Sequence, residues 1–133
     1  MKVKEAFTET IKLTFDGRML TSEVLKDVVI DVQQVLVDHK ASVEITEGKK
    51  FLSLVLTTPP VSITFAAQKE SMTKDKYKDI LAQAIVIHSA AQRILGNFMI
   101  MFIKYPCPCR LFRNKEEALV WLNEQGEKRG LKA

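Results

Sequence analysis

Two cysteines separated by one proline are the first candidate for chemistry in this sequence. Cys107-Pro108-Cys109 brings two sulfur atoms close together, which raises the alternatives of a metal site or a redox pair. Structural zinc needs four ligands, usually in two pairs, and the histidines His39 and His88 lie far away in the chain. A thioredoxin-like pair has two residues between its cysteines. The spacing therefore favours two packed thiols near a sheet edge, and it predicts neither a bound metal nor a cofactor.

A second candidate is the pair His88-Ser89, which directly follows the apolar stretch at 80–87. Ligands of α/β folds bind at the carboxyl ends of strands, so a Ser-His hydrolytic pair is one alternative. A nucleophile elbow also needs glycines around the serine, and the sequence has none there. We therefore predict a capping or core role for His88, a position on a helix face for His39, and no catalytic residues.

The hydroxyl residues Ser62 and Thr64 form a third candidate, because they precede a short helix expected at about 65–72. A helix N-terminus attracts phosphate through its unpaired amide groups and its positive dipole end. Phosphorylation at Ser62 or Thr64 is therefore one alternative. Simple capping of the helix by one of these hydroxyls is the main prediction.

Composition limits the classes of protein to which the chain can belong. It has 133 residues, of which 47% are hydrophobic and 27% charged, and this favours one folded domain, predicted at 1–126, with a frayed basic tail at 127–133. The net charge of +4 is spread among acidic residues, as in the alternating stretch at 74–79, so a nucleic-acid partner is not favoured. No signal-like apolar segment opens the chain, and the longest uncharged apolar stretch, 94–103, is too short to span a membrane. We expect a cytoplasmic protein.

The expected strands come from apolar patterning and turn signals. Residues 10–15 alternate between apolar and polar, and Asp16-Gly17 then predicts a tight hairpin turn into a second strand at 18–26. A rival interpretation starts a helix at Ser22, but the β-branched run at 28–30 favours extended chain. The remaining expected strands are 51–56, 80–88 and 109–112.

The expected helices begin at capping signals, in which a short polar residue is followed three positions later by Gln or Glu. These pairs are Asp31 with Gln34, Ser89 with Gln92, and Asn114 with Glu117, and the helices they open end near Gly48, Phe102 and Gly126. The order is β-β-α-β-α-β-α-β-α. This order predicts an α/β fold with a mixed, largely parallel sheet, an N-terminal β-hairpin, helices on both faces, and 80–88 as a central strand.

Three stretches carry a resemblance to a known family. They are SAAQRILGNF at 89–98, PCPCRLF at 106–112 and EEALVWL at 116–122, with weaker support from 16–31 and 47–50. These stretches resemble bacterial STAS-like proteins, which are similar to anti-sigma-factor antagonists of the stage II sporulation protein AA type. The resemblance implies four or five strands with helices on one side, and a small non-enzymatic regulatory or ligand-binding module.

One departure from this family concerns phosphorylation. Phosphorylatable members carry an Asp-Ser-Ser/Thr-Gly type turn before the second helix. The matching stretch at 60–66 contains Ser62 and Thr64 but no aspartate and no glycine. A kinase-driven switching cycle is therefore not expected in this chain.

The segment at 94–103 is apolar around nearly its whole circumference, which is unusual for a surface helix. Sheet contact can absorb one face of this helix, with Ile94, Leu95, Phe98 and Phe102, and it leaves Met99, Met101 and Ile103 over. The candidate interface or ligand surface is Phe98, Met99, Met101, Phe102 and Ile103. The alternatives are ordinary core, a homodimer or protein interface, and an apolar or membrane-surface site. Our first hypothesis is a non-enzymatic STAS-like module that binds a protein partner or itself. The alternative is a carrier or sensor of a small apolar or lipid-like ligand beside helix 90–103.

Overall fold

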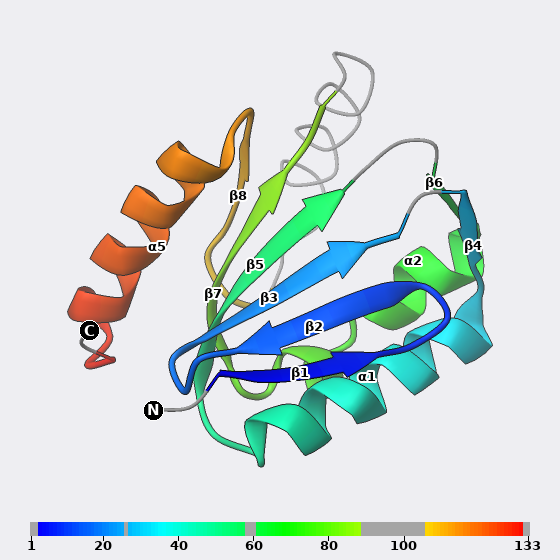
Figure 1. Cartoon of the computed structure of the whole chain (residues 1–133), viewed down its shortest axis with the longest axis horizontal. Coiled ribbons are helices and arrows are strands. Elements are labelled where there is room, and N and C mark those ends of the chain that lie inside the picture. The colour runs from blue at the N-terminus through cyan, green and yellow to red at the C-terminus, as the bar shows by residue number, and fades with distance from the viewer. Residues whose placement is uncertain (1–2, 26, 58–60, 89–105, 132–133) are drawn as a thin grey trace.

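The structure of the chain, a computed structural model, describes residues 3–25, 27–57, 61–88 and 106–131. Within these residues, a six-stranded sheet has the order β1-β2-β3-β5-β7-β8, and β4 and β6 form a separate two-stranded ribbon (Figure 1). The strands of the large sheet are β1 (Lys4–Phe7), β2 (Ile11–Phe15), β3 (Met19–Val24), β5 (Phe51–Thr57), β7 (Ile80–Val86) and β8 (Cys109–Phe112). The ribbon consists of β4 (Val28–Ile30) and β6 (Val61–Ile63), and the helices are α1 (Val32–Thr46), α2 (Phe65–Ser71), α3 (Lys74–Tyr77) and α5 (Lys115–Lys128). The predicted helix at 89–102 lies outside the described residues.

The predicted hairpin is present between β2 and β3, which pair antiparallel. The Asp16 carboxylate accepts from the backbone amides of Arg18 and Met19 at 2.9 and 2.7 Å, and Gly17 has a φ of +94°. Ser22 lies in β3, so the rival helix starting there is wrong. An additional strand, β1, pairs antiparallel with the outer side of β2.

The remaining pairings of the large sheet, β3 with β5, β5 with β7 and β7 with β8, are parallel. The predicted mixed, largely parallel α/β sheet with an N-terminal hairpin is therefore confirmed. β7 is an interior strand, but it lies beside the edge strand β8, and β5 is closer to the middle of the sheet. The predicted order of elements is incomplete, because it lacks the short elements β1, β4, β6 and α3.

Helix starts agree with the sequence prediction. Asp31 accepts from the Gln34 amide at 2.8 Å, Thr64 from the Ala67 amide at 3.1 Å, and Asn114 from the Glu117 amide at 2.9 Å. Each bond satisfies an amide that the helix itself leaves unpaired. Among the described hydrogen bonds, none runs from the Asp31 amide back to the Gln34 side chain, whose Nε2 donates to Asp38 at 3.0 Å.

The C-terminal helix extends further than predicted. Gly126 lies within α5, which continues to Lys128, so the prediction that the helix ends at Gly126 is wrong. Residues 127–131, expected in a frayed tail, have defined contacts. The Leu131 amide donates to the Gly126 carbonyl at 2.7 Å, and Arg18 Nε donates to the Leu131 carbonyl at 3.0 Å.

The large sheet is covered on both faces (Figure 1). Along a strand, neighbouring side chains point to opposite faces, and Met19 and Leu20 accordingly belong to different cores. The core beneath α5 contains Met19, Leu52, Leu54, Ala82, Ala84, Val86, Ala118 and Leu122. The core beneath α1 contains Ile11, Leu13, Phe15, Leu20, Ile45 and Phe51. The one-sided arrangement implied by the family resemblance is therefore wrong, and the two-sided arrangement predicted from patterning is right.

A cluster of hydrogen bonds around one carboxylate holds α1 against the β1–β2 connection. Asp38 accepts from the Thr8 hydroxyl at 2.6 Å, from the Thr10 hydroxyl at 2.7 Å and from the Gln34 side-chain amide at 3.0 Å. Thr10 is only 4% exposed, so its hydroxyl depends on this acceptor. The cluster fixes α1 relative to the antiparallel half of the sheet.

Replacing this acceptor is expected to destabilise the fold. Asp38→Ala leaves the buried Thr10 hydroxyl unpaired, which should lower the free energy of unfolding by about 1–3 kcal/mol in urea denaturation. Glu44→Ala is the control, because Glu44 is exposed on the same helix and its loss should change stability by less than about 0.5 kcal/mol. Equal unfolding midpoints for the two variants would contradict the role given to Asp38.

Candidate functional site

The structure separates the two phosphorylation candidates. Thr64 caps α2 through the Ala67 amide, as the capping prediction required. Ser62 is a residue of β6, and its backbone pairs with Val29. The candidate surface on the apolar helix, Phe98, Met99, Met101, Phe102 and Ile103, lies outside the described residues, and so does Ser89.

Both cysteines carry free thiols. Cys109 begins the edge strand β8, in agreement with the predicted location near a sheet edge. Burial raises the pKa of Cys107 to about 12, with a further contribution from Cys109, and burial raises the pKa of Cys109 to about 11. Both sulfurs are therefore held as neutral thiols at physiological pH, which makes them poor nucleophiles. Among the described residues, no cluster of three or more metal-ligating side chains occurs.

The raised thiol pKa values predict slow alkylation of the folded protein. Only the thiolate reacts, so at about pH 8 the native protein should react with iodoacetamide on the order of 100-fold more slowly than the urea-unfolded chain. The native rate should still be rising above about pH 10, because the pKa values lie at about 11 and about 12. Mass spectrometry of the labelled protein measures both rates. Similar rates in the native and unfolded states would show that the thiols are not shielded.

His88 is exposed and lies two residues after β7, at the carboxyl end of the parallel strands. It lines a shallow hollow whose other members are Glu23, Leu56, Thr57, Val86, Arg113, Asn114 and Lys115. The core alternative for His88 does not fit this exposed position, and the capping alternative stays a prediction because the helix it would cap lies outside the described residues.

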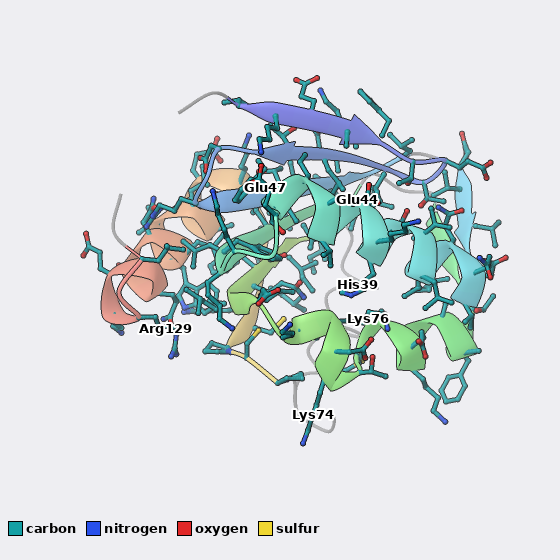
Figure 2. All side chains as sticks on the ribbon, turned by 90° about the horizontal axis from the view of Figure 1, so that it is seen from below. His39, Glu44, Glu47, Lys74, Lys76 and Arg129 are labelled. Carbon is teal, nitrogen blue, oxygen red and sulfur yellow. The ribbon has the colours of Figure 1, made fainter. Side chains whose placement is uncertain are left out.

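A deeper cleft lies on the other side of the molecule from α5, between α1, α3 and the sheet. Its volume is about 390 Å³, which is within the range of small-molecule sites. The floor consists of residues from β3, β5 and β7: Leu20, Ser22, Phe51, Ser53, Val55, Ile80 and Gln83. The walls are His39, Ser42, Val43 and Thr46 of α1, then Gly48, and Asp75, Lys76, Lys78 and Asp79 around α3. Figure 2 shows the His39 and Lys76 side chains in the space between the two helices.

A chain of hydrogen bonds crosses the floor of this cleft. The Ser53 hydroxyl donates to Gln83 Oε1 at 3.1 Å, and Gln83 Nε2 donates to the Tyr77 hydroxyl at 3.0 Å. Ser53 and Gln83 are 4% and 9% exposed and lie opposite each other in the β5–β7 pairing. These bonds fix the orientation of the Gln83 amide, because its oxygen and nitrogen have different partners.

The charged wall of the cleft is internally neutralised. The Lys76 side chain is only 7% exposed, and its ammonium contacts Asp75 at 2.7 Å and Glu70 at 3.1 Å. Burial works against the charge on Lys76, but hydrogen bonds to the two carboxylates outweigh it and raise its pKa. Hydrogen bonds from Lys76 and Thr73 lower the pKa of Asp75 to about 2. The ammonium therefore stays charged and fully paired.

His39 behaves differently from Lys76. Burial lowers its pKa, and the nearby Lys76 charge lowers it further, while Asp75 and Asp79 oppose the shift. The imidazole is therefore neutral at physiological pH. Within the described part of the chain, no hydrogen bond occupies the ring.

No pattern in the sequence predicted this cleft. His39 lies on α1, in agreement with the predicted position on a helix face, but Ser53 and Gln83 were not predicted as site residues. A usable signal was present, since each is a lone polar residue inside a strand that is otherwise apolar, FLSLVL at 51–56 and ILAQAIV at 80–86. A polar residue at such a position must have a buried partner.

The shifted His39 pKa predicts a pH dependence of stability. In the unfolded chain His39 has a pKa near 6.5, and in the folded protein the pKa is lower. The unfolded state then binds more protons as pH falls below 6.5, so the free energy of unfolding decreases in that range. In His39→Gln, the decrease in the free energy of unfolding that His39 causes between about pH 7 and pH 5.5 should disappear. Urea denaturation at several pH values tests this, and identical pH slopes for the two proteins would contradict it.

Comparison with known proteins adds a family and a fold. The family described as domain of unknown function DUF7793 matches residues 12–125. A solved structure of an uncharacterised DUF3478-family protein with a SpoIIAA-like fold, from Shewanella loihica PV-4, is similar over 91% of this chain and 92% of that chain, with a TM-score of 0.59 and 13% identity. No curated protein matches the chain. The chain belongs to the DUF7793 family, and the predicted STAS-like, stage II sporulation protein AA-like fold is confirmed. Among the described helices, none has the length and apolarity that a membrane span requires.

Proposed function

We propose that this member of the DUF7793 family is a non-enzymatic, STAS-like regulatory module that acts in the cytoplasm by binding a protein partner or a second copy of itself. The observation that carries this proposal is the β4–β6 ribbon, with the start of α2 beside it. This part of the molecule stands apart from the large sheet (Figure 1) and exposes large apolar side chains.

The ribbon is poorly covered by the rest of the described chain. Val29 is 66% exposed, and Ile63 is 39% exposed. Ile63 pairs with Ile30, which is the residue after Val29. Val29 and Ile63 therefore occupy alternate positions and face opposite sides of the ribbon. Among the described strands, β4 and β6 pair only with each other. Two strands alone are marginally stable in water, so a partner that covers the ribbon would stabilise it.

An exposed aromatic residue adjoins the ribbon. Phe65 is the first residue of α2 and is 75% exposed, and Lys69 lies 5.6 Å from its ring centre. Burying such a ring at an interface contributes about 2–3 kcal/mol, and aromatic residues dominate the energetics of many interfaces. The Thr64 cap fixes the backbone at this point. We call Ile63 and Phe65 the ribbon surface and propose it as the partner-binding face, and Val29 lies on the other side of the ribbon.

Two earlier hypotheses remain predictions. The apolar helix around Phe98–Ile103 is a second candidate interface, and a small apolar or lipid-like ligand beside helix 90–103 is the alternative function. Both depend on residues outside the described part of the chain.

Site-specific photocrosslinking tests the ribbon surface. A photoreactive phenylalanine analogue at position 65 should give a discrete covalent adduct in cells that produce the protein, and the same analogue at position 120 should not. Val120 is a matched control, because it is 60% exposed but lies on α5. The mass of the adduct distinguishes a second copy of the chain from another protein.

A substitution at position 65 measures how much the Phe65 ring contributes to the association. Phe65→Ser should weaken the identified association at least about tenfold by sedimentation velocity or titration, while Val120→Ser should leave it unchanged. Both positions are exposed, so neither variant should alter the unfolding midpoint by much. Association that is unaffected by Phe65→Ser, or adducts of equal yield at positions 65 and 120, would overturn the proposal.

A further inference from the structure

The floor of the cleft between α1 and α3 carries polar residues where a helix-covered sheet face normally carries apolar ones. Ser22, Ser53 and Gln83 come from β3, β5 and β7, which are neighbouring strands, and all three line the cleft. Burying a hydroxyl or an amide costs free energy unless it is hydrogen-bonded, whereas valine at such a position costs nothing of this kind. The opposite face of β5 and β7 has Leu52, Leu54, Ala82, Ala84 and Val86. In these two strands the polar residues are therefore on the face that contains the cleft.

The hydrogen-bonding capacity left over in the cleft consists mainly of acceptors. The Ser53 hydroxyl already donates to Gln83, and the Ser42 hydroxyl donates to the Asp38 carbonyl at 2.9 Å. The Thr46 hydroxyl donates to the Ser42 carbonyl at 2.7 Å. Each hydroxyl oxygen keeps lone pairs after its hydrogen is used. A ligand that complements this lining must therefore bring its own N–H or O–H donors.

Three of the four charged residues that line the cleft, Asp75, Lys76 and Asp79, are paired, and the fourth, Lys78, is exposed to solvent. A lysine ammonium has three N–H donors, and those of Lys76 have partners in Asp75 at 2.7 Å, Glu70 at 3.1 Å and Thr73 at 3.3 Å. Asp79 lies 3.5 Å from the ammonium of Lys50. An ion placed beside these paired groups would lose hydration without gaining a free counter-ion, which is strongly unfavourable, and an exposed ammonium such as that of Lys78 is screened by water. The neutral His39 ring, in contrast, retains one donor and one acceptor.

The rest of the floor is apolar, with Leu20, Phe51, Val55 and Ile80 beside the polar row. From this combination we infer that the cleft is a binding site for a small uncharged molecule that carries hydroxyl or N–H donors on an apolar or aromatic body. Its polar contacts are His39, Ser42 and Ser53, with Gln83 holding Ser53 in place. This site is separate from the ribbon surface and does not depend on it.

Three matched aromatic probes test the inferred chemistry. The first, 4-hydroxybenzamide, is uncharged and carries donors. The second, 4-hydroxybenzoate, has nearly the same shape but is anionic at about pH 7.5. The third, 4-methoxy-N,N-dimethylbenzamide, is uncharged and has no donor. Binding is followed by chemical-shift changes in amide NMR spectra of the full chain. We expect saturable millimolar binding of 4-hydroxybenzamide, and at least about tenfold weaker binding of the other two.

Substitutions then locate the site. Ser42→Phe places a ring in the cleft and should abolish binding of 4-hydroxybenzamide, while His39→Leu should weaken it severalfold. Lys40→Phe is the matched control. It adds the same ring to the same helix, but position 40 lines a different hollow. Ser53→Val is a smaller change that tests the floor if Ser42→Phe does not fold. Circular dichroism and the unfolding midpoint establish that each variant is folded.

The outcomes are distinct from those of the partner-binding test. Loss of probe binding in Ser42→Phe with retention in Lys40→Phe and in Phe65→Ser supports the site. No saturable binding of 4-hydroxybenzamide, equal or tighter binding of 4-hydroxybenzoate, or shift changes centred away from Ser42 and Ser53 would overturn it. The ribbon surface would be unaffected by any of these failures.

Discussion

The strand period of two is the constraint on which this structure depends. β3, β5 and β7 are interior strands, so each step along them moves a side chain from one core to the other. Phe51 and Leu52 are adjacent but are buried beneath α1 and α5 respectively. A shift of one residue in pairing would exchange the two sets of side chains. The irregularity in the β5–β7 pairing falls between Phe51 and Leu52, at the start of both strands, and the pairing that follows is regular.

This constraint makes the two faces of the sheet unequal. On the α5 side, β5 and β7 contribute only apolar residues, and Ala82 and Ala84 are small enough for α5 to approach closely. On the other side the same strands contribute Ser53 and Gln83, which bond to each other and to Tyr77. Close packing of a helix over that polar pair would have to satisfy the remaining lone pairs. The cleft therefore lies on the face of the sheet where β5 and β7 contribute polar side chains.

Much of the fold could be predicted from sequence because its signals are local. Asp16-Gly17 fixes a turn through its own backbone, and Asp31 and Asn114 cap helices through amides three residues away. The strands β1 and β6 escaped prediction, and the run at 28–30 was expected to be extended but not to form a strand of its own. β4 pairs with a strand about 30 residues away, and the large apolar residues Phe7 of β1 and Val29 of β4 are both 66% exposed. The end of α5 was misjudged because Gly126 favours a helix end locally. Glycine is required there by close contact instead, since a Cβ atom would lie 2.8 Å from the backbone carbonyl oxygen of Leu131.

The cleft could not be predicted because no single segment contains it. His39 and Ser42 come from α1, Ser53 and Gln83 from two strands, and Lys76 from α3. Only the register of β5 with β7 places Ser53 opposite Gln83. What the sequence does contain is the reason that the cleft stays open. The α3 wall carries Lys76 bound to Asp75 and to Glu70 of α2. The Lys76 side chain is nearly buried, but the two carboxylates are 65% and 34% exposed, and they are hydrated more favourably at a rim than in a closed core. Apolar residues at the same positions would collapse onto α1 to escape water, so the charged wall preserves a cavity that an ordinary core would fill.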